Sequence, residues 1–276
     1  PGGDQEHARF ASFSRQVARF LETRQFEAEI LHLHDYHTGL IPDIIHQRKI
    51  KIATVLTIHD VQNEGRSDGD ILLAADLSHR YLQALGWNLH DANIDMLLRG
   101  IVGADIVNTV SPTYAKEIMN PSVAGGLADV LQSRQARVYG ILNGIDQDFY
   151  DPRYDGLIFQ NYGPANSTGG KAANKKHLQE RLGLEVEPKR PLFVLVTRLV
   201  ARKGIGLILE ILPQLLKNGG QLVILGRGEK GFEELLKGEA LKNPKYISFI
   251  NEFDEKMAHQ IYAASDFFLV PSQTEP

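Results

Sequence analysis

The pattern of apolar and polar residues in the first half of the chain switches repeatedly between helical spacing and short continuous runs. Between residues 5 and 23 the apolar side chains recur every three or four positions, which predicts an amphipathic helix. Ser111 and Pro112 supply a capping residue and an early proline, which predict the start of another helix. The expected strands are residues 30–33, 52–58 and 105–110, and the expected helices are residues 5–23, 40–47 and a segment from 112.

The second half begins with a change in composition. Residues 151–170 are rich in Pro, Gly, Asn, Asp and Ser and show little periodicity, which predicts an irregular linker between domains. Beyond this segment the strand and helix patterns alternate again. The expected strands are residues 191–199, 221–225, 246–250 and 267–270, and the expected helices are residues 171–182, 205–216, 232–242 and 256–264.

Strands that alternate with helices predict mostly parallel sheets with helices on both faces, because parallel neighbours need a crossover connection. We therefore expect an α/β fold with two Rossmann-like, doubly wound domains, residues 1–170 including the linker and residues 171–276. In such sheets the ligand crevice lies beyond the carboxyl ends of the strands. His37, His59 and Ser111 each follow a predicted strand, so they are expected at that edge.

Composition narrows the classes of function. The chain has 276 residues, is 43% hydrophobic and carries a formal charge of −4, which predicts no general affinity for nucleic acid or an anionic membrane. No apolar run approaches the ~20 residues that span a bilayer. The absence of cysteine excludes disulfides and thiolate chemistry. Because the sequence starts with Pro1 rather than Met, we expect the true start of the gene product to be absent.

Two cations follow the predicted strand 191–199. Arg198 and Lys203 precede a helix start, where helix amides and basic side chains favour the same anion, so they predict a diphosphate site. A solvated basic turn is the alternative. Gly226 and Gly228 follow the next strand, and without a Cβ their backbone can approach a phosphate or ribose. The acidic partner of a dinucleotide site is only loosely met, so NAD is not predicted.

Polar side chains at the strand ends of the first half suggest a sugar site. His59 can donate to a sugar hydroxyl or support positive character at a reacting carbon, and a structural histidine is the alternative. Asp35 and His37 could contact a substrate hydroxyl and the His59 loop, although Asp35 could equally cap the helix after Gly39. His32 and His34 lack partners at ligand spacing, so no metal site is predicted.

Two further candidates stand in turns. Asn143 lies in an Asn-Gly-Ile-Asp segment that could be only a turn, and Glu275 follows a predicted buried strand.

Taken together and in order, the motifs resemble glycosyltransferase family 5, the starch synthases and bacterial glycogen synthases. They are HDYHTGL at 34–40, TIHD at 57–60, VSPTYA at 110–115, ILNGID at 141–146, NKKHLQ at 174–179, TRL at 197–199 with KG at 203–204, and VPS at 270–272 with EP at 275–276.

The resemblance implies a GT-B fold and a retaining glucosyltransferase that elongates an α-1,4-glucan, glycogen or starch, from a nucleotide sugar. ADP-glucose is the expected donor rather than UDP-glucose, and no cofactor or metal is expected. Arg198 and Lys203 would hold the donor diphosphate, and His59 would support the glucosyl transition state. Glu275 would contact the donor glucose. The residues expected to bind substrate are Asp35, His37, Asn143, Gly226 and Gly228.

The sequence departs from the family pattern at several positions. The N-terminal glycine-rich loop has no counterpart, and the chain stops before the second glutamate of the family's two-glutamate motif. The substituted positions are Asp60, Asn63, Leu98, Gln273 and Thr274. They indicate a divergent subfamily and keep two alternatives open: a non-catalytic protein that binds glucan or a partner, and another GT-B hexosyltransferase. The expected compartment is the bacterial cytoplasm or the plastid stroma.

Overall fold

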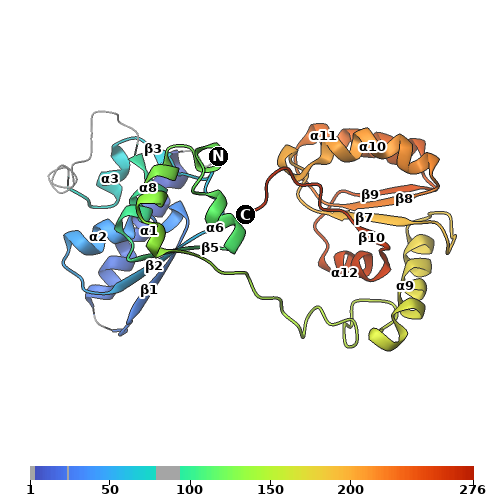
Figure 1. Cartoon of the computed structure of the whole chain (residues 1–276), viewed down its shortest axis with the longest axis horizontal. Coiled ribbons are helices and arrows are strands. Elements are labelled where there is room, and N and C mark those ends of the chain that lie inside the picture. The colour runs from blue at the N-terminus through green and yellow to red at the C-terminus, as the bar shows by residue number, and fades with distance from the viewer. Residues whose placement is uncertain (1–3, 24, 79–93) are drawn as a thin grey trace. The chain divides into compact units, whose positions relative to one another are not determined.

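The computed structural model describes residues 4–23, 25–78 and 94–276, and it divides into two compact units (Figure 1). The first unit comprises residues 1–144 and the second comprises residues 145–275. Each unit is built around its own parallel sheet of four strands. The predicted alternation of strands and helices is therefore present twice.

The sheet of the first unit has the strand order β1-β2-β5-β6, and every neighbouring pair is parallel. The register pairs His34 with Thr57, and Thr57 with Asn108 on the next strand. These polar residues therefore lie in one row across three strands. The strands are β1 (Ile30–His34), β2 (Ala53–Ile58), β5 (Ile106–Thr109) and β6 (Val138–Gly140), and a separate antiparallel ribbon joins β3 (Arg66–Ser67) to β4 (Ile94–Asp95).

Helices of the first unit begin at residues with capping side chains. Ser111 accepts a hydrogen bond from the Tyr114 amide at 3.2 Å, and Asp95 accepts one from the Leu98 amide at 2.8 Å, so the predicted cap at Ser111 forms. The α-helices are α1 (Asp4–Glu22), α2 (Ile41–Gln47), α3 (Asp70–Ala74), α5 (Met96–Gly103), α6 (Pro112–Glu117), α7 (Pro121–Ala124) and α8 (Leu127–Ser133). The 3-10 helices are η1 (Tyr36–Thr38) and η3 (Gln135–Arg137).

The core of the first unit packs these helices onto the sheet. Leu33 on β1 and Leu56 on β2 are at most 1% exposed, as are Leu97 and Ile101 on α5. Gly39 lets η1 approach α5, because a Cβ at this position would lie 2.0 Å from the carbonyl oxygen of Met96. The glycine of the HDYHTGL motif therefore fixes the strand end that carries Asp35.

The second unit has the strand order β10-β7-β8-β9, again all parallel. One face of this sheet packs against α9 and α12 through residues such as Leu178 and Ile261, and the other packs against α10 and α11 through Ile208 and Leu236 (Figure 1). The strands are β7 (Leu192–Val196), β8 (Gln221–Leu225), β9 (Ile247–Ile250) and β10 (Phe267–Phe268). The helices are η4 (Pro164–Asn166), α9 (Ser167–Arg181), η5 (Ala201–Lys203), α10 (Ile205–Lys217), α11 (Lys230–Lys242) and α12 (Glu255–Ala264).

The segment expected to link the domains packs with the second unit. Asp155 binds His259 on α12 at 2.7 Å, and the side-chain oxygen of Asn174 on α9 accepts hydrogen bonds from the amides of Phe159 and Gln160 at 3.0 and 3.1 Å. The units therefore divide after residue 144, whereas the sequence placed the division at residue 170. Residues 151–163 form a covering loop that is tied down by these polar contacts, whereas residues 164–170, also predicted to be irregular, belong to η4 and to the start of α9.

Two features are absent from the residues that the structure describes. No helix in this part of the chain has the length and apolar character needed to cross a membrane. Within the same residues, no group of three or more histidine or carboxylate side chains has the arrangement of a metal site.

Candidate active site

Asp35 closes the end of β1 and ties it to the end of β2. Its carboxylate Oδ1 accepts a hydrogen bond from the backbone N–H of His59 at 2.7 Å, and its own N–H donates to the Thr57 carbonyl at 2.9 Å. The backbone of Asp35 has a positive φ of 50°, which is costly for a residue with a side chain. Of the two roles open from the sequence, the structure shows contact with the His59 loop, and no side-chain cap.

Three histidines line the same strand ends. Nδ1 of His34 lies 3.0 Å from Nε2 of His59, and the rings of His34 and His32 are 4.4 Å apart between centroids. Nε2 of His32 lies 2.7 Å from the hydroxyl of Thr57, which in turn donates to Asn108 at 2.7 Å. From the sequence, we considered His34 as a metal ligand and as part of the HDYHTGL motif, and we did not predict the contact with His59. The signal was the alternation of His32 and His34 on a strand parallel to the one that leads to His59.

The other two candidates of the first unit lie apart from this arrangement. His37 stacks on Tyr36 with ring centroids 3.9 Å apart and contacts the edge of Phe10 at 4.5 Å, so its ring is held by aromatic packing. Asn143 belongs to an exposed segment that follows β6. In the described part of the chain, neither side chain hydrogen-bonds to Asp35 or His59. Their roles as substrate-binding residues stay predictions.

In the second unit the structure brings Lys203 and Glu275 together. Nζ of Lys203 donates to Oε1 of Glu275, and the Ser272 hydroxyl donates to the same oxygen at 2.5 Å. The turn after β7 can approach this segment because Gly204 has a φ of +72° and lacks a Cβ, which would lie 2.1 Å from the Pro271 carbonyl oxygen. Two residues predicted independently, 72 positions apart, thus form one ion pair.

The electrostatics of Glu275 follow from this pairing. Burial alone would raise the pKa of Glu275, but the hydrogen bonds from Lys203 and Ser272 and the charges of Lys203 and Arg202 together lower it. Glu275 is therefore an ionised acceptor that orients the ammonium group of Lys203. A carboxylate in this state suits hydrogen bonds from hydroxyl groups and is a poor proton donor.

Arg198 lines a pocket of about 490 Å³ at the carboxyl ends of β7, β8 and β9. The volume falls in the range of small-molecule sites. Arg227 brings a second cation, and Phe253 offers an aromatic ring that is 92% exposed. The other lining residues are Tyr150, Val196, Thr197, Leu225, Gly226, Glu252, Asp254, Glu255, Ala258, His259 and Tyr262. Arg198 and Gly226 are the predicted site residues that this pocket unites.

The loop that contains Gly226 and Gly228 uses its backbone amides in hydrogen bonds within the second unit. A Cβ on Gly226 would lie 1.9 Å from the Thr197 carbonyl oxygen, and one on Gly228 would lie 2.2 Å from that of Leu199. The Gly226 amide donates to the Ile250 carbonyl at 3.1 Å, and the Gly228 amide donates to the Glu233 carboxylate at 2.9 Å. The absence of side chains therefore lets this loop pair with the extension of β7. Direct binding of substrate by the two amides stays a prediction.

His259 lies at the inner wall of this pocket and was missed by the sequence analysis. The residue is 3% exposed, its Nδ1 lies 2.7 Å from the Asp155 carboxylate, and its ring stacks on Tyr150 with centroids 4.8 Å apart. The sequence predicted a helix over 256–264, and we assigned no role to this histidine. A histidine within the apolar face of that helix was the signal of a buried polar contact.

The positions that depart from the family pattern have local partners. Asp60 accepts a hydrogen bond from the Asn63 side chain at 3.4 Å, so the two substitutions meet in one turn. Leu98 packs against the core of the first unit. The Gln273 amide donates to the Arg202 carbonyl at 2.9 Å through the backbone alone. These residues are compatible with the fold, and their effect on activity is not visible in the contacts.

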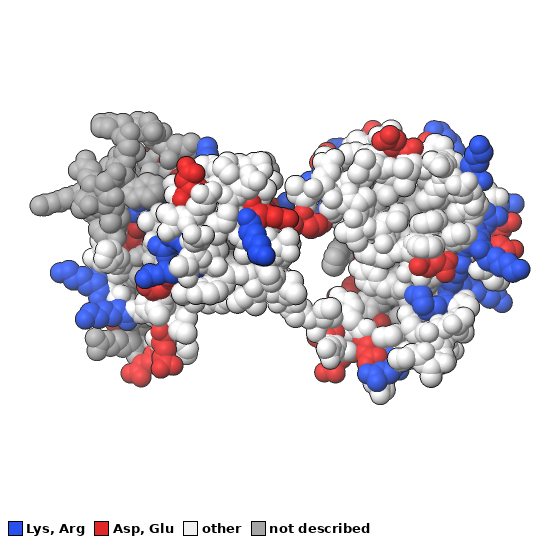
Figure 2. Space-filling model, in the orientation of Figure 1, with Lys and Arg blue, Asp and Glu red and all other residues white. Residues whose placement is uncertain are grey.

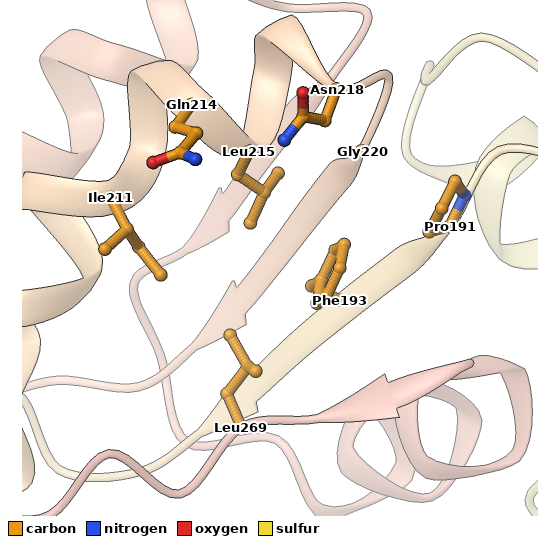
Figure 3. A pocket seen from close by; sticks show the side chains of 8 residues that line it. All are labelled: Pro191, Phe193, Ile211, Gln214, Leu215, Asn218, Gly220 and Leu269. Carbon is orange, nitrogen blue, oxygen red and sulfur yellow. The ribbon is translucent and has the colours of Figure 1, made fainter.

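A second pocket of the second unit, of about 360 Å³, lies between α10 and β7 (Figure 3). No charged side chain lines it, and it contains none of the predicted site residues, so it does not suit a diphosphate. Its lining consists of Pro191, Phe193, Ile211, Gln214, Leu215, Asn218, Gly220 and Leu269.

Figure 2 shows acidic and basic groups interspersed on the visible face, in keeping with the formal charge of −4.

Comparison with known proteins identifies both units. Residues 2–133 match the family model described as starch synthase catalytic domain, and residues 179–276 match glycosyl transferases group 1. The glycogen synthase of Exiguobacterium sibiricum is 40% identical in an alignment that is 280 residues long with its gaps. This alignment covers 97% of this chain and 57% of the relative. Glycogen synthase 2 of Geobacter sulfurreducens is 38% identical over 274 residues, which cover 97% of this chain and 56% of the relative.

Solved structures agree with this result. The catalytic domain of starch synthase IV from Arabidopsis thaliana, bound to ADP and acarbose, superposes with a TM-score of 0.91 at 30% identity and covers 100% of this chain and 58% of that one. A trehalose-phosphate synthase from Burkholderia vietnamiensis has a TM-score of 0.60 at 13% identity, which shows the fold alone. The chain spans a little over half the length of the relatives that it matches.

The α/β fold with two Rossmann-like parallel sheets is confirmed, and so is the resemblance read from the motifs. Eight of the nine predicted site residues lie within the two segments that match family models, and Asn143 lies between these segments. The chain belongs to the starch synthase and glycogen synthase family of glycosyltransferases with the GT-B fold.

Proposed function

We propose that this chain carries part of the active site of a retaining glucosyltransferase that elongates an α-1,4-glucan from ADP-glucose. The observation that carries the proposal is the Lys203–Glu275 pair, which is formed by the turn after β7, the same strand end that places Arg198 in the pocket. The proposed activity belongs to a whole protein, because the relatives that match this chain are longer than the chain itself. Bacterial cytoplasm, rather than plastid stroma, is favoured by the bacterial glycogen synthases among its relatives.

The pocket of the second unit supports a nucleotide-sugar donor. Arg198 and Arg227 supply positive charge for a diphosphate, and the exposed ring of Phe253 can stack on a base. Starch synthase IV, which superposes on this chain, has been solved with ADP. An adenine ring presents a larger surface for stacking than uracil, which supports ADP-glucose over UDP-glucose.

The proposed reaction needs no cofactor. The bond between the anomeric carbon and the diphosphate oxygen breaks, and the acceptor hydroxyl oxygen forms its bond to the same carbon, while the hydroxyl proton passes to the departing diphosphate. Negative charge grows on that diphosphate, and the fixed cations Arg198 and Lys203 stabilise it. Glu275 keeps Lys203 oriented and, as an ionised acceptor, binds hydroxyl groups of the donor glucose. His59 supports the positive character of the glucosyl group.

Transfer of radiolabelled glucose to glycogen tests the proposal. The full-length product of the gene is incubated with glycogen and either ADP-glucose or UDP-glucose, and the label in precipitated glucan is counted. We expect incorporation from ADP-glucose to exceed that from UDP-glucose. No incorporation from either donor, with glucan binding retained, would refute the enzyme and leave the non-catalytic alternative that the substitutions at Asp60, Leu98 and Gln273 suggested.

A further inference from the structure

The three histidines of the first unit form a row, which we define as His32, His34 and His59. Side chains alternate along a strand, so His32 and His34 share one face of β1, and the register places His34 opposite Thr57, two residues before His59. The ring centroids are 4.4 Å apart for His32 and His34, and 5.3 Å apart for His34 and His59. His34 is therefore the middle ring of the histidine row.

The bond between His34 and His59 limits the charge of this pair. Only one proton can lie between Nδ1 of His34 and Nε2 of His59, which are 3.0 Å apart. One ring therefore donates, and the other accepts through a lone pair and is neutral. As long as the bond is made, the two imidazoles carry at most one positive charge.

The middle position favours His34 as the ring that accepts. His34 faces an imidazole on each side, and burial together with the charges of His32 and His59 lowers the pKa of His34, against the opposing effect of Asp35. His59 has one imidazole neighbour in the row, and its backbone N–H is held by the Asp35 carboxylate. Nδ1 of His34 is therefore the better acceptor of the pair, and we assign Nε2 of His59 as the donor across the 3.0 Å contact.

His34 is itself held in place by its own loop. Its backbone N–H donates to the Thr38 hydroxyl at 2.6 Å, and that hydroxyl donates to the His34 carbonyl at 3.0 Å. The ring of His34 thus extends from a backbone that is fixed by the strand ladder on one side and by Thr38 on the other. Such a ring can serve as a rigid acceptor.

We propose that His34 is a positioning residue for His59: its Nδ1 accepts the Nε2 proton of His59 and leaves Nδ1 of His59 as the nitrogen that meets the substrate. The inference rests on the proposed function, in which His59 supports the reacting sugar. In that reaction His59 would present Nδ1 in a fixed direction toward a sugar hydroxyl. His34 would touch neither the donor nor the glucan.

Nuclear magnetic resonance of the ¹⁵N-labelled chain tests the bond directly. A scalar coupling across the hydrogen bond is expected between Nδ1 of His34 and Nε2 of His59, with the proton attached to His59. The His34→Asn variant keeps an oxygen close to the position of Nδ1, so the ¹⁵N shifts of His59 should still show its proton on Nε2. The His34→Ala variant should lose that preference for the Nε2 tautomer. Absence of the coupling in the wild-type chain, or a proton attached to His34, would overturn the proposal.

Kinetics of the full-length gene product test the role of the pairing. We expect His34→Ala to lower kcat for glucose transfer at least about tenfold with KM for ADP-glucose within about twofold, because a misdirected ring affects the reacting geometry. His34→Asn should keep kcat within about threefold of the wild type. His177→Asn, which alters a ring stacked on Phe159 in the second unit, is the matched control and should change neither constant.

The two failures are distinguishable. If the wild-type protein transfers no glucose while the coupling is present, the proposed function fails and the pairing stands. If the protein is active, the coupling is present and His34→Ala has wild-type kcat, the positioning role is refuted. A change of the acid limb of the kcat–pH profile in His34→Ala, restored in His34→Asn, would support the role, since a purely structural residue would not move that limb.

Discussion

Asp95 provides a test of the electrostatics of the first unit. It caps α5 by accepting a hydrogen bond from the Leu98 amide at 2.8 Å, and its side chain is 11% exposed. Burial is the main cause that raises its pKa from 3.8 to about 7; the Leu98 amide opposes this, and the neighbouring carboxylate of Glu64 adds to it. The guanidinium of Arg66, 4.0 Å from Oδ2, offsets only part of the effect.

The consequence for stability has a definite sign. Between pH 3.8 and about 7 the folded chain keeps a proton on Asp95 that the unfolded chain releases, so stability falls as pH rises through this window. A difference of roughly three pH units at 1.36 kcal/mol each amounts to about 4 kcal/mol over the whole window. Between pH 5 and pH 8 the loss should be about 3 kcal/mol.

The substitution Asp95→Asn should remove this dependence, because the amide oxygen can still cap α5 and carries no charge. The unfolding free energy of the variant should stay level between pH 5 and pH 8, so the difference between variant and wild type should grow by about 3 kcal/mol in favour of the variant. Native-state hydrogen exchange in peptides from β1, β2 and β5, followed by mass spectrometry, reports the opening free energy of this unit.

The matched control is Asp254→Asn, which alters an equivalent cap on α12 of the second unit, where Asp254 accepts from the Met257 amide at 2.9 Å. It should leave the pH dependence of the first unit unchanged. If Asp95→Asn and the wild type lose stability in parallel between pH 5 and pH 8, the reasoning about Asp95 is wrong.

Three further predictions concern the second unit. Lys203→Ala should cost at least ~2 kcal/mol of transition-state stabilisation, roughly 30-fold in kcat/KM, measured by glucose transfer; an unchanged rate would mean that the cation is misassigned. Phe253→Ala should raise KM for the nucleotide sugar about tenfold through lost stacking, while Phe253→Tyr should not; equal KM values in both variants would contradict the stacking role. Gly204→Ala should lower the unfolding free energy by at least ~2 kcal/mol in urea titrations, because of its φ of +72° and the contact with Pro271. Gly206→Ala, which meets nothing within 4 Å, should be neutral or slightly stabilising, and equal losses in both would exclude the steric explanation.

The fold was largely predictable because long apolar runs and helical spacing are local signals. Strand 221–225 was predicted with its observed bounds, and helix 205–216 differs from α10 by one residue. Short elements such as β6 and α7 were not predicted, because three or four residues carry too little periodicity. The packing of 151–170 on the second unit includes the contact between Asp155 and His259. These two residues are 104 positions apart, so no local sequence pattern links them.

The sequence predicted which strand ends carry the candidate site residues. It did not predict which of these residues contact one another. Lys203 and Glu275 could each be chosen from their motifs, but their ion pair depends on the close approach of Gly204 to Pro271. The bond between His34 and His59 depends on two strands being parallel neighbours in a definite register. Pattern and motif therefore identify the residues, and tertiary packing determines which of them meet.

The bond between Asp155 and His259 also bears on where a fragment that keeps the pocket of about 490 Å³ can begin. A fragment that began at residue 171 would lack Asp155 and Tyr150, so His259 would lose its carboxylate partner and its stacked ring, and Asn174 would lose the amides that it binds. Each lost hydrogen bond costs ~0.5–1.5 kcal/mol net, so such a fragment should unfold at lower urea concentration than residues 145–276. The unit that could be exchanged between related genes is therefore the sheet together with the covering segment that precedes α9. A recombination point that preserves this unit falls near residue 145.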